Sequence, residues 1–362
     1  MTESRNEKKY MQLALRLAGK GSGFVSPNPM VGAVFVRDGV IIGRGYHEKF
    51  GGPHAEINAI DNAGGDVRGA TLYCTLEPCS HTDKKTPPCA QRLIKEGIHR
   101  VVISTHDPNP LVNGSGIRIL KDAGIDVKTG LLEKESREMN RFFNKYISAK
   151  APFIMVKIAQ TLDGFIAQER TKQTWITNPA AQKLVHQWRS EYDAVLIGIG
   201  TLKSDNPRLT VRALKGRDPI RILVDRDLEA NPEARFFDQN SDGRAIIFAA
   251  KGVSAEKINA LEHTGAEVIL VERDRTGKLP LSSLLSHLHE SGISSVMIEG
   301  GQKIFTQFLK ENLTDELQMI LAPAIWGRGI RAVTDKIPLD KFRLKRSQAL
   351  GDNVLLTFRR SE

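Results

Sequence analysis

Four residues in the first hundred have the chemical types and the order of a catalytic zinc site. His54 is followed two residues later by Glu56, and Cys79 and Cys89 each follow a proline. One imidazole and two thiolates supply three zinc ligands, and a site with three protein ligands keeps its fourth position for water. Zinc lowers the pKa of a bound water toward about 7, and Glu56 could accept the water proton and deliver it to the reacting molecule. The four residues therefore predict hydrolysis by a zinc-activated water.

The spacing of the cysteines narrows the reaction. A His-x-Glu with Pro-Cys is the signature of zinc deaminases that act on nucleobases, whose generic form is Pro-Cys-x-x-Cys. Here Cys89 comes ten positions after Cys79. The third cysteine, Cys74, lies in an apolar strand pattern and is expected to be a core thiol outside the site. An odd number of cysteines, all between positions 74 and 89, argues against a disulfide framework and for a cytoplasmic protein.

Short elements must bring these residues together. Residues 55–60 predict a helix with His54 at its start, and Cys89 opens a second helix behind Pro87-Pro88. A thiol at a helix N-terminus has a lowered pKa, which helps it bind metal as a thiolate. Alternating strand and helix patterns predict a mixed sheet layered with helices. The strands are expected at 31–36, 40–46, 70–76, 100–104 and 125–128, and the other helices at 10–18 and 116–123.

Length and charge limit the number of domains and the kind of binding partner that can be expected. A chain of 362 residues is expected to form two domains, because single cores rarely exceed roughly 250–300 residues. The net charge of +10 is spread over both halves without a basic tail. This distribution does not by itself indicate nucleic acid, and it suits a phosphate-bearing small substrate. The N-terminus is too polar for a secretory signal, and no apolar run reaches the roughly 20 residues that span a bilayer.

The sequence pattern of the second half predicts an α/β domain of a nucleotide-binding type. A helix over 133–146 leads to a junction at 148–152, and Asn178-Pro179 caps a helix that ends at Ser190. Most of the strand patterns are continuous apolar runs, as in parallel sheets. They are expected at 153–159, 195–198, 220–225, 245–249, 267–271, 295–298 and 354–358. No Gly-x-Gly-x-x-Gly is present, but glycines at 198–200 and 300–301 follow strands and precede helical patterns, where backbone N–H groups can bind phosphate.

The first half resembles the deaminase half of the bifunctional riboflavin-biosynthesis deaminase/reductase family. The motifs that carry the resemblance are Pro27-Asn-Pro-Met-Val-Gly, Gly45-Tyr-His, Thr75-Leu-Glu-Pro-Cys-Ser-His, Thr86-Pro-Pro-Cys and Asp107-Pro-Asn-Pro. The resemblance implies a substrate pocket made by Asn28, His47, His81, Lys85, Asp107 and Asn109. The loop before Thr86 is one residue longer than is common in the family and reads Thr82-Asp-Lys-Lys, so that either Lys84 or Lys85 could reach the substrate.

The second half resembles the reductase half of the same family. The matching motifs are Lys157-Ile-Ala-Gln-Thr-Leu-Asp-Gly, Trp175-Ile-Thr, Trp188-Arg-Ser, Asp193-Ala-Val-Leu-Ile-Gly, Asp205-Asn-Pro-Arg-Leu-Thr-Val-Arg and Glu299-Gly-Gly. The resemblance implies a dihydrofolate-reductase-like fold that uses NADPH. It places the substrate on Gln173, Arg189, Leu209, Arg212 and Glu299, and the cofactor near Ala159, Gln160, Trp175, Thr201, Asp205 and Gly301.

Taken together, we expect an α/β protein with a cytidine-deaminase-like three-layer αβα domain at 1–148 and a dihydrofolate-reductase-like domain at 149–362. The resemblance implies zinc-dependent deamination of 2,5-diamino-6-ribosylamino-4(3H)-pyrimidinone 5′-phosphate, followed by NADPH reduction of the ribosyl group to ribityl. We expect a homo-oligomer in the cytoplasm that engages neither nucleic acid nor membrane.

Two other functions fit parts of the pattern. One is a tRNA or nucleobase zinc deaminase with a fused accessory domain, which the wide cysteine spacing disfavours. The other is a non-catalytic nucleotide-binding protein stabilised by zinc. Such a structural site needs a fourth protein ligand, for which His81 and Cys74 are the nearby candidates.

Overall fold

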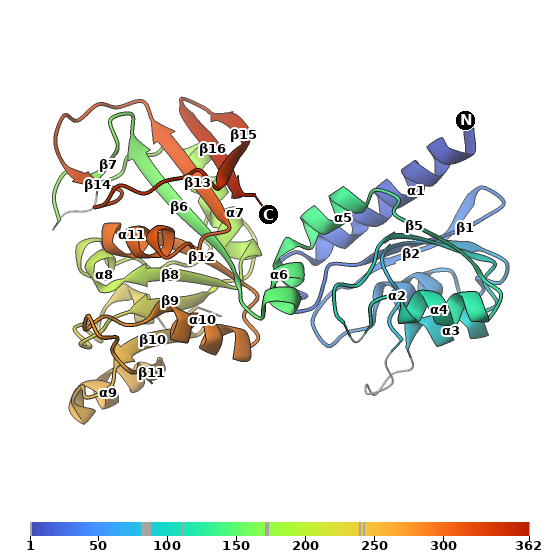
Figure 1. Ribbon diagram of the computed structural model, residues 1–362, viewed down its shortest axis with the longest axis horizontal. Coiled ribbons are helices and arrows are strands. Elements are labelled where there is room, and N and C mark those ends of the chain that lie inside the picture. The colour runs from blue at the N-terminus through green and yellow to red at the C-terminus, as the bar shows by residue number, and fades with distance from the viewer. Residues whose placement is uncertain are drawn as a thin grey trace. The chain divides into compact units, whose positions relative to one another are not determined.

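A computed structural model describes residues 2–80, 88–110, 112–170, 174–238, 240–241 and 243–361. The chain divides into two compact units, residues 1–150 and 151–362, which are described separately below (Figure 1).

The first unit is built on a five-stranded sheet in the order β2-β1-β3-β4-β5. β1 runs antiparallel to both of its neighbours, whereas β3, β4 and β5 are mutually parallel. The strands are β1 (Gly32–Arg37), β2 (Val40–Tyr46), β3 (Thr71–Leu76), β4 (Arg100–Thr105) and β5 (Asp126–Thr129). The helices are α1 (Thr2–Ala18), the short 3₁₀ turn η1 (Gly19–Gly21), α2 (Ala55–Asn62), α3 (Cys89–Lys95), α4 (Ser115–Asp122), α5 (Glu133–Met139) and α6 (Arg141–Ala149).

Helices cover both faces of this sheet. Along β1, Ala33 and Phe35 pack with residues of α2, α3 and α4, while Val34 and Val36 pack with residues of α1 on the opposite face. This alternation follows from the two-residue repeat of a strand. Figure 1 shows α2, α3 and α4 on one side of the sheet and α1 and α5 on the other. The expected three-layer αβα domain is confirmed.

The start of α2 is fixed in place by close packing on β2. A Cβ atom at Gly45 would lie 2.4 Å from the Ala59 nitrogen and 2.6 Å from the Ala55 carbonyl oxygen, so no larger residue fits at this position without a shift. The Gly-Tyr-His motif therefore lets the backbone of β2 touch α2. This contact holds the helix that carries His54 as its N-cap and Glu56 in its first turn.

The second unit contains a nine-stranded sheet in the order β11-β10-β9-β8-β12-β6-β13-β16-β15. The strands from β11 to β13 are parallel, and β16 and β15 add antiparallel at the other end. The strands are β6 (Phe153–Thr161), β8 (Ala194–Gly198), β9 (Ile220–Val224), β10 (Ala245–Ala250), β11 (Glu267–Val271), β12 (Ser295–Gly300), β13 (Glu316–Ala322), β15 (Phe342–Leu350) and β16 (Asn353–Arg360), and β7 (Phe165–Ala167) pairs separately with β14 (Ile330–Arg331).

The helices of this unit are α7 (Pro179–Glu191), α8 (Ile199–Asp205), η2 (Arg235–Phe237), α9 (Ala255–Glu262), α10 (Leu281–Glu290) and α11 (Gln302–Lys310). α10 and α11 pack on the sheet face that includes Val156, Ile158 and Ile298. Lys157, between Val156 and Ile158, and Glu299, next to Ile298, therefore point to the opposite face. The expected cap of α7 is present, because the Asn178 side chain accepts a hydrogen bond from the Ala181 N–H. The expected second domain of α/β class is confirmed.

Two strands of this sheet were not expected from the sequence. β13 and β15 lie between the predicted helical pattern after Gly301 and the predicted last strand, where no strand was anticipated. Within the described part of the chain, no helix has the length and apolar character needed to cross a membrane.

Candidate active sites

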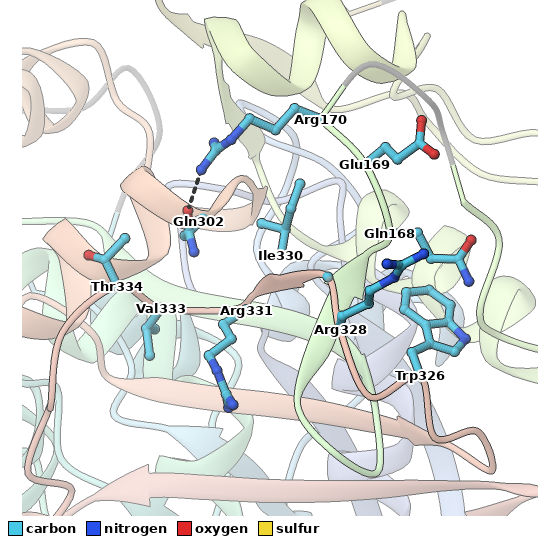
Figure 2. Close-up of a pocket in the computed structure, with 11 residues that line it drawn as sticks. Gln168, Glu169, Arg170, Gln302, Trp326, Arg328, Ile330, Arg331, Val333 and Thr334 are labelled. Carbon is cyan, nitrogen blue, oxygen red and sulfur yellow. Dashed lines mark hydrogen bonds between the residues drawn. The ribbon is translucent and has the colours of Figure 1, made fainter.

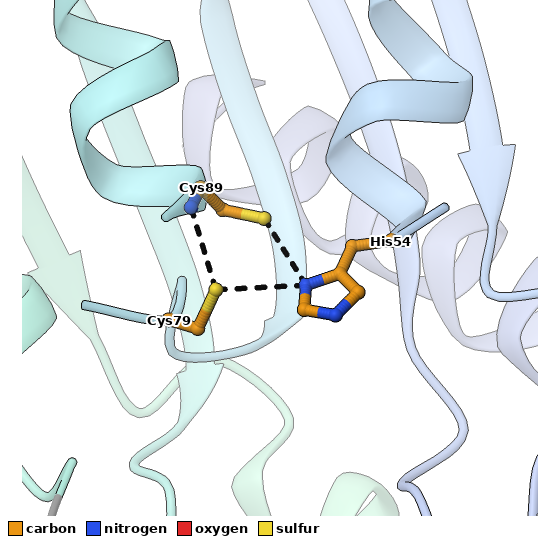
Figure 3. A group of neighbouring side chains, drawn as sticks. All are labelled: His54, Cys79 and Cys89. Atoms are coloured by element: carbon orange, nitrogen blue, oxygen red, sulfur yellow. Dashed lines mark hydrogen bonds between the residues drawn. The ribbon is translucent and has the colours of Figure 1, made fainter. Parts of the chain in front are cut away.

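The three predicted zinc ligands meet at the ends of three elements. His54 precedes α2, Cys79 follows β3 and Cys89 opens α3, and their ligand atoms all lie within 4.8 Å of one another. His54 Nδ1 is 3.2 Å from Cys89 Sγ and 3.5 Å from Cys79 Sγ (Figure 3). In a tetrahedral zinc site the ligand atoms stand about 3.5–3.8 Å apart. The geometry of the three side chains therefore fits a zinc ion.

The protonation of the two thiols also suits a cation. A hydrogen bond from Cys89 lowers the pKa of Cys79 to about 4, and the same contact, together with burial, raises the pKa of Cys89 well above its usual range. The backbone N–H of Cys89 also donates to Cys79 Sγ, at 3.3 Å. One thiolate is thus already stabilised at neutral pH, and binding of a metal displaces the remaining thiol proton.

Glu56 is buried beside these ligands. Its side chain projects from the first turn of α2, and the residue is only 3% exposed. Burial raises its pKa above the ordinary value of a glutamate, against the opposing effect of His54. A raised carboxyl pKa favours a group that must both accept and release a proton near neutral pH. The predicted proton carrier therefore lies in the right place and in a suitable environment.

The metal centre gives a direct prediction about Cys79. We expect the purified protein to hold about one zinc ion per chain, and Cys79→Ala to lose nearly all of it, since two ligands alone bind zinc weakly. Metal analysis after dialysis measures the content. Cys74→Ala is the matched control, because Cys74 is fully buried in β3 and is not part of the ligand group. Equal zinc in Cys79→Ala and in the wild type would contradict the assignment.

Two of the predicted deaminase substrate residues lie next to this centre. The Asn28 side-chain amide is 3.3 Å from His47 Nε2, and the opposite ring nitrogen, His47 Nδ1, is 3.0 Å from the Pro53 carbonyl oxygen. A carbonyl oxygen can only accept a hydrogen bond, so His47 Nδ1 donates to it. In the neutral ring Nε2 is then the acceptor for the Asn28 amide. The ring of His47 stands edge-on to the ring of His54, with 5.7 Å between centroids. The structure thus brings Asn28 and His47 to the zinc ligands.

The other predicted deaminase residues are placed in part. Asp107 and Asn109 follow β4, and the Asn109 N–H donates to Asp107 Oδ1 at 2.8 Å. β4 is the parallel neighbour of β3, so this turn leaves the sheet beside the turn that carries Cys79. The predicted contacts His81 and Lys85, and the alternative Lys84, lie outside the described residues.

In the second unit, Arg189 and Glu299 form a bidentate ion pair. Arg189 Nε donates to Glu299 Oε1 at 2.6 Å, and a second guanidinium nitrogen donates to Oε2 at 2.8 Å. Burial opposes ionisation of Glu299, but Arg189 outweighs it and holds the pKa of this carboxyl below its ordinary value. The remaining guanidinium nitrogen of Arg189 donates to the Thr210 carbonyl. The pair thereby connects α7, the end of β12 and the segment that contains the predicted residue Leu209, whereas the predicted contact Gln173 lies outside the described residues.

Lys157 is close to this ion pair, although its sequence motif did not predict a role for it. It lies in β6 on the same face as Glu299, and the charges that act on it come from Glu299, Arg189 and Asp205. Burial lowers its pKa below the ordinary value of a lysine, and burial likewise raises the pKa of Asp205. The signal in the sequence was a single charged residue inside the apolar run of a central strand.

Four of the predicted cofactor residues, Ala159, Gln160, Thr201 and Gly301, lie at or shortly after the carboxyl ends of the parallel strands β6, β8 and β12. Thr201 is in the first turn of α8, and a Cβ atom on Gly301 would lie 2.8 Å from its hydroxyl oxygen, so these two predicted residues are in contact. Ala159 and Gln160 end β6, Asp205 ends α8, and Trp175 is 69% exposed. Carboxyl ends of parallel strands are the usual place for nucleotide binding in α/β sheets.

A cationic cavity opens beside this edge. It has a volume of about 870 Å³ and lies between the β7–β14 pair and the first residue of α11 (Figure 2). Among the described residues, three arginines line it, Arg170, Arg328 and Arg331, against one acidic residue, Glu169. Arg170 reaches the Gln302 side chain at 3.5 Å. Because Gln302 directly follows Gly301, the cavity adjoins the predicted cofactor contacts, and its charge suits a phosphorylated ligand.

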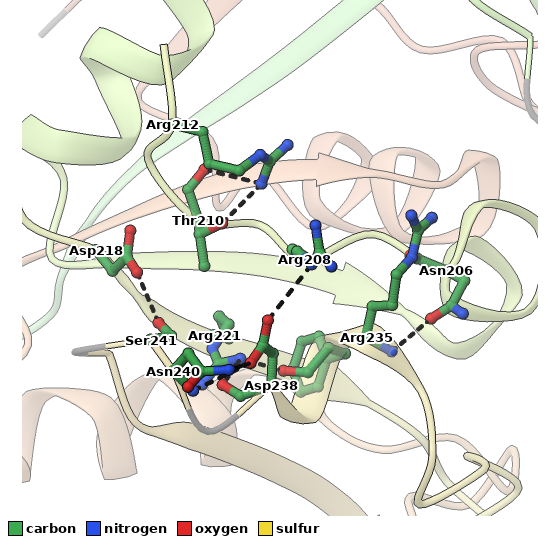
Figure 4. A network of polar contacts seen from close by, with 11 residues as sticks. Asn206, Arg208, Thr210, Arg212, Asp218, Arg221, Arg235, Asp238, Asn240 and Ser241 are labelled. Atoms are coloured by element: carbon green, nitrogen blue, oxygen red, sulfur yellow. Dashed lines mark hydrogen bonds and ion pairs between the residues drawn. The ribbon is translucent and has the colours of Figure 1, made fainter. Parts of the chain in front are cut away.

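A second group of arginines surrounds Arg212. Burial and the nearby cations Arg189 and Arg208 lower the pKa of Arg212, whose guanidinium also donates to the Thr210 hydroxyl at 2.7 Å. Arg235 donates through its guanidinium to the backbone carbonyls of Asp205 and Asn206, and so holds the loop between α8 and Arg212. Its backbone N–H also donates to the Asn206 side chain at 2.8 Å (Figure 4). Several guanidinium groups close to one another favour a dianionic ligand such as a phosphate.

Comparisons with known proteins divide the chain in the same two parts. Residues 4–105 match the family described as cytidine and deoxycytidylate deaminase zinc-binding region, and residues 152–356 match the RibD C-terminal domain. The chain is 41% identical over 362 residues to riboflavin biosynthesis protein RibD of Aquifex aeolicus, with 98% of each chain covered. It is 37% identical over 366 residues to the RibD of Escherichia coli, covering 96% of this chain and 97% of that one.

Solved structures agree over nearly the whole length. A diaminohydroxyphosphoribosylaminopyrimidine deaminase/5-amino-6-(5-phosphoribosylamino)uracil reductase from Thermotoga maritima is similar with a TM-score of 0.87 and 38% identity, covering 99% of this chain and all of that one. RibD of Acinetobacter baumannii is similar with the same TM-score and 34% identity.

Proposed function

The chain belongs to the family of the bifunctional riboflavin biosynthesis protein RibD. We propose that the two reactions are divided between two domains, with the deamination at residues 1–148 and the reduction at residues 149–362. The family is that of a zinc-dependent deaminase and an NADPH-dependent reductase acting on a phosphorylated pyrimidine. The observation that supports the division best is the meeting of His54, Cys79 and Cys89 beside the buried Glu56 in the first unit.

The deaminase would convert 2,5-diamino-6-ribosylamino-4(3H)-pyrimidinone 5′-phosphate to the corresponding uracil. His54, Cys79 and Cys89 would hold a zinc ion, which would acidify a bound water for use as the nucleophile. Glu56 would first accept a proton from the attacking water and deliver it to the ring nitrogen. It would then take the second proton from the added hydroxyl and deliver it to the departing amine, which leaves as ammonia. The Asn28–His47 pair presents amide and imidazole groups to the ring, and Asp107 and Asn109 contact the substrate from the neighbouring turn. A raised pKa in Glu56 supports the repeated proton transfer.

The reductase would convert the ribosyl group of that product to ribityl, giving 5-amino-6-(5-phosphoribitylamino)uracil. Reduction breaks the bond between C1′ and the ring oxygen, and it needs hydride at C1′ and a proton at the oxygen. Ala159, Gln160, Trp175, Thr201, Asp205 and Gly301 are the proposed contacts of NADPH, which would supply the hydride when bound. The half-buried Lys157 carries the proposed proton donor, its ammonium group, and Arg189, Leu209 and Glu299 are the proposed substrate contacts. We assign the substrate phosphate to Arg212.

A phosphate contact at Arg212 makes a specific prediction. Arg212→Gln should raise the reductase KM for the phosphorylated substrate about tenfold, because an ion-paired hydrogen bond is lost. The same variant should handle the dephosphorylated substrate as the wild type does. Steady-state kinetics with both compounds measure this difference. Arg346→Gln, in the exposed strand β15, is the control and should change neither KM. An equal rise for both compounds would place the phosphate elsewhere.

A two-part assay tests the whole proposal. The pure protein is incubated with the diaminopyrimidinone phosphate, with and without NADPH. Without NADPH the aminouracil ribosyl phosphate should accumulate, and with NADPH the ribityl product should form. Absence of turnover in both arms would overturn the proposed function.

The remaining expectations about the surroundings of the enzyme stay predictions. We propose a cytoplasmic homo-oligomer that binds its small-molecule substrates without nucleic acid or membrane. The cytoplasmic location is supported by the three cysteines, all of which are free thiols. Sedimentation or light scattering of the purified protein measures the oligomeric state.

A further inference from the structure

A buried carboxylate next to the zinc ligands has no role in the reactions described above. Glu77 follows β3, two residues before Cys79, and its side chain is fully buried, at 0% exposure. It accepts hydrogen bonds from four backbone N–H groups, those of Asp107 (3.4 Å), Gly114 (3.0 Å), Gly116 (3.0 Å) and Ile117 (3.3 Å). The exposed imidazole of His106 lies 3.7 Å from the same carboxylate.

These four donors all come from the segment 107–117. This segment contains Asp107 and Asn109, and it ends in the first turn of α4. The first N–H groups of a helix have no partner within the helix and need an acceptor. The N-cap of α4 is Gly114, which has no side chain to serve as one. Glu77 supplies the acceptor from the turn after β3, and its negative charge suits the positive N-terminal end of helix α4.

The turn that carries Cys79 is also pressed directly against α4. A Cβ atom at Gly116 would lie 2.1 Å from the Pro78 carbonyl oxygen, so the backbones of these residues are in contact. The hydroxyl groups of Ser80 and Ser115 are 2.5 Å apart. The backbone contact of Pro78 with Gly116, the Ser80–Ser115 hydrogen bond and the Glu77 carboxylate thus join the turn after β3 to the segment after β4.

We propose that Glu77 is a positioning residue of the deaminase, which holds the substrate-binding turn at Asp107 and Asn109 in register with the zinc ligand Cys79. The inference rests on the proposed function, because it assumes that these two turns bind substrate and metal. An acceptor needed only for helix α4 could come from a residue at its own N-cap. An acceptor from the turn after β3 instead fixes the distance between the metal-binding turn at Cys79 and the substrate-binding turn at Asp107 and Asn109.

The test is Glu77→Gln in the full-length protein. A glutamine keeps the size but offers one acceptor oxygen, and its NH₂ group would face backbone N–H donors. We expect the deaminase KM to rise about tenfold or more, while kcat changes by less than about threefold, because ground-state binding is lost and the chemical groups remain. Zinc content should stay at that of the wild type. Backbone amides of residues 107–117 should exchange hydrogen faster, and the reductase activity of the same chain should not change.

Glu7→Gln is the matched control. Glu7 is also a buried glutamate of this unit, but it pairs with Arg100 and Lys128, at the opposite end of β4 and on β5. It should lower thermal stability without moving the deaminase KM. If Glu77→Gln cannot be purified with zinc, Glu77→Asp, which keeps the charge but is one methylene shorter, should show the same rise in KM.

Two results would overturn the inference. One is an unchanged KM in a folded, zinc-loaded Glu77 variant, and the other is an equal rise in KM in Glu7→Gln. Both require a wild type that deaminates the substrate. A wild type without that activity would instead overturn the proposed function.

Discussion

Glu56→Gln should reduce the deaminase kcat about a thousandfold or more and leave the zinc in place. The expected loss corresponds to about 4 kcal/mol of transition-state free energy, within the range for removal of a general acid–base group. Glutamine fills the same buried volume at the start of α2 but cannot carry a proton. Because the three zinc ligands are other residues, metal analysis should find the wild-type content.

The controls separate chemistry from folding. The reductase rate of Glu56→Gln, measured with the deaminated substrate and NADPH, should equal that of the wild type. Glu96→Gln makes the same change directly after α3, where the side chain pairs with Arg92, and should deaminate normally. Glu56→Ala should be as inactive as Glu56→Gln. Undiminished deamination by either Glu56 variant with zinc bound would show that another group moves the proton.

The metal centre could be predicted from sequence because its signals are local. Each zinc ligand sits at an element boundary that the sequence marks, with a proline before each cysteine and a helical pattern after His54. The residues that connect the centre to the rest of the site have no such mark. Glu77 bonds to the segment 107–117, some thirty to forty positions later. Only the pairing of β3 with β4 brings these segments together.

The second unit shows the same limit for strands. Six of its seven parallel strands were predictable, because they are continuous apolar runs. The seventh, β13, was missed because the buried polar residues Glu316 and Gln318 interrupt its apolar run. β15 was not predictable either, since it is charged, mostly exposed and lies at the edge of the sheet. Its strand conformation comes from pairing with β16 and not from any periodicity of its own. A pattern of burial cannot report an element that buries little.

Lys157→Met should lower the reductase kcat by about a hundredfold or more and leave deamination unchanged. The substitution keeps the length of the side chain but removes the ammonium group, and with it the proposed proton donor. The fold should persist, because Glu299 keeps its bidentate pair with Arg189. Lys203→Met is the matched control. Lys203 lies on α8 and forms an exposed ion pair with Glu229, and this variant should reduce the substrate normally.

The pH dependence of the same reaction gives a second, independent measurement of Lys157. Burial lowers its pKa below the ordinary value of 10.5, so the ammonium loses its proton at a lower pH than an exposed lysine would. A donor must be protonated to act, and the wild-type reductase rate should therefore fall as the pH rises through this lowered pKa. Lys157→Met has no such proton to lose, and its residual rate should lack that alkaline fall. A wild-type rate that stays constant up to the ordinary pKa of lysine, or an alkaline fall that persists unchanged in Lys157→Met, would assign the proton to another donor.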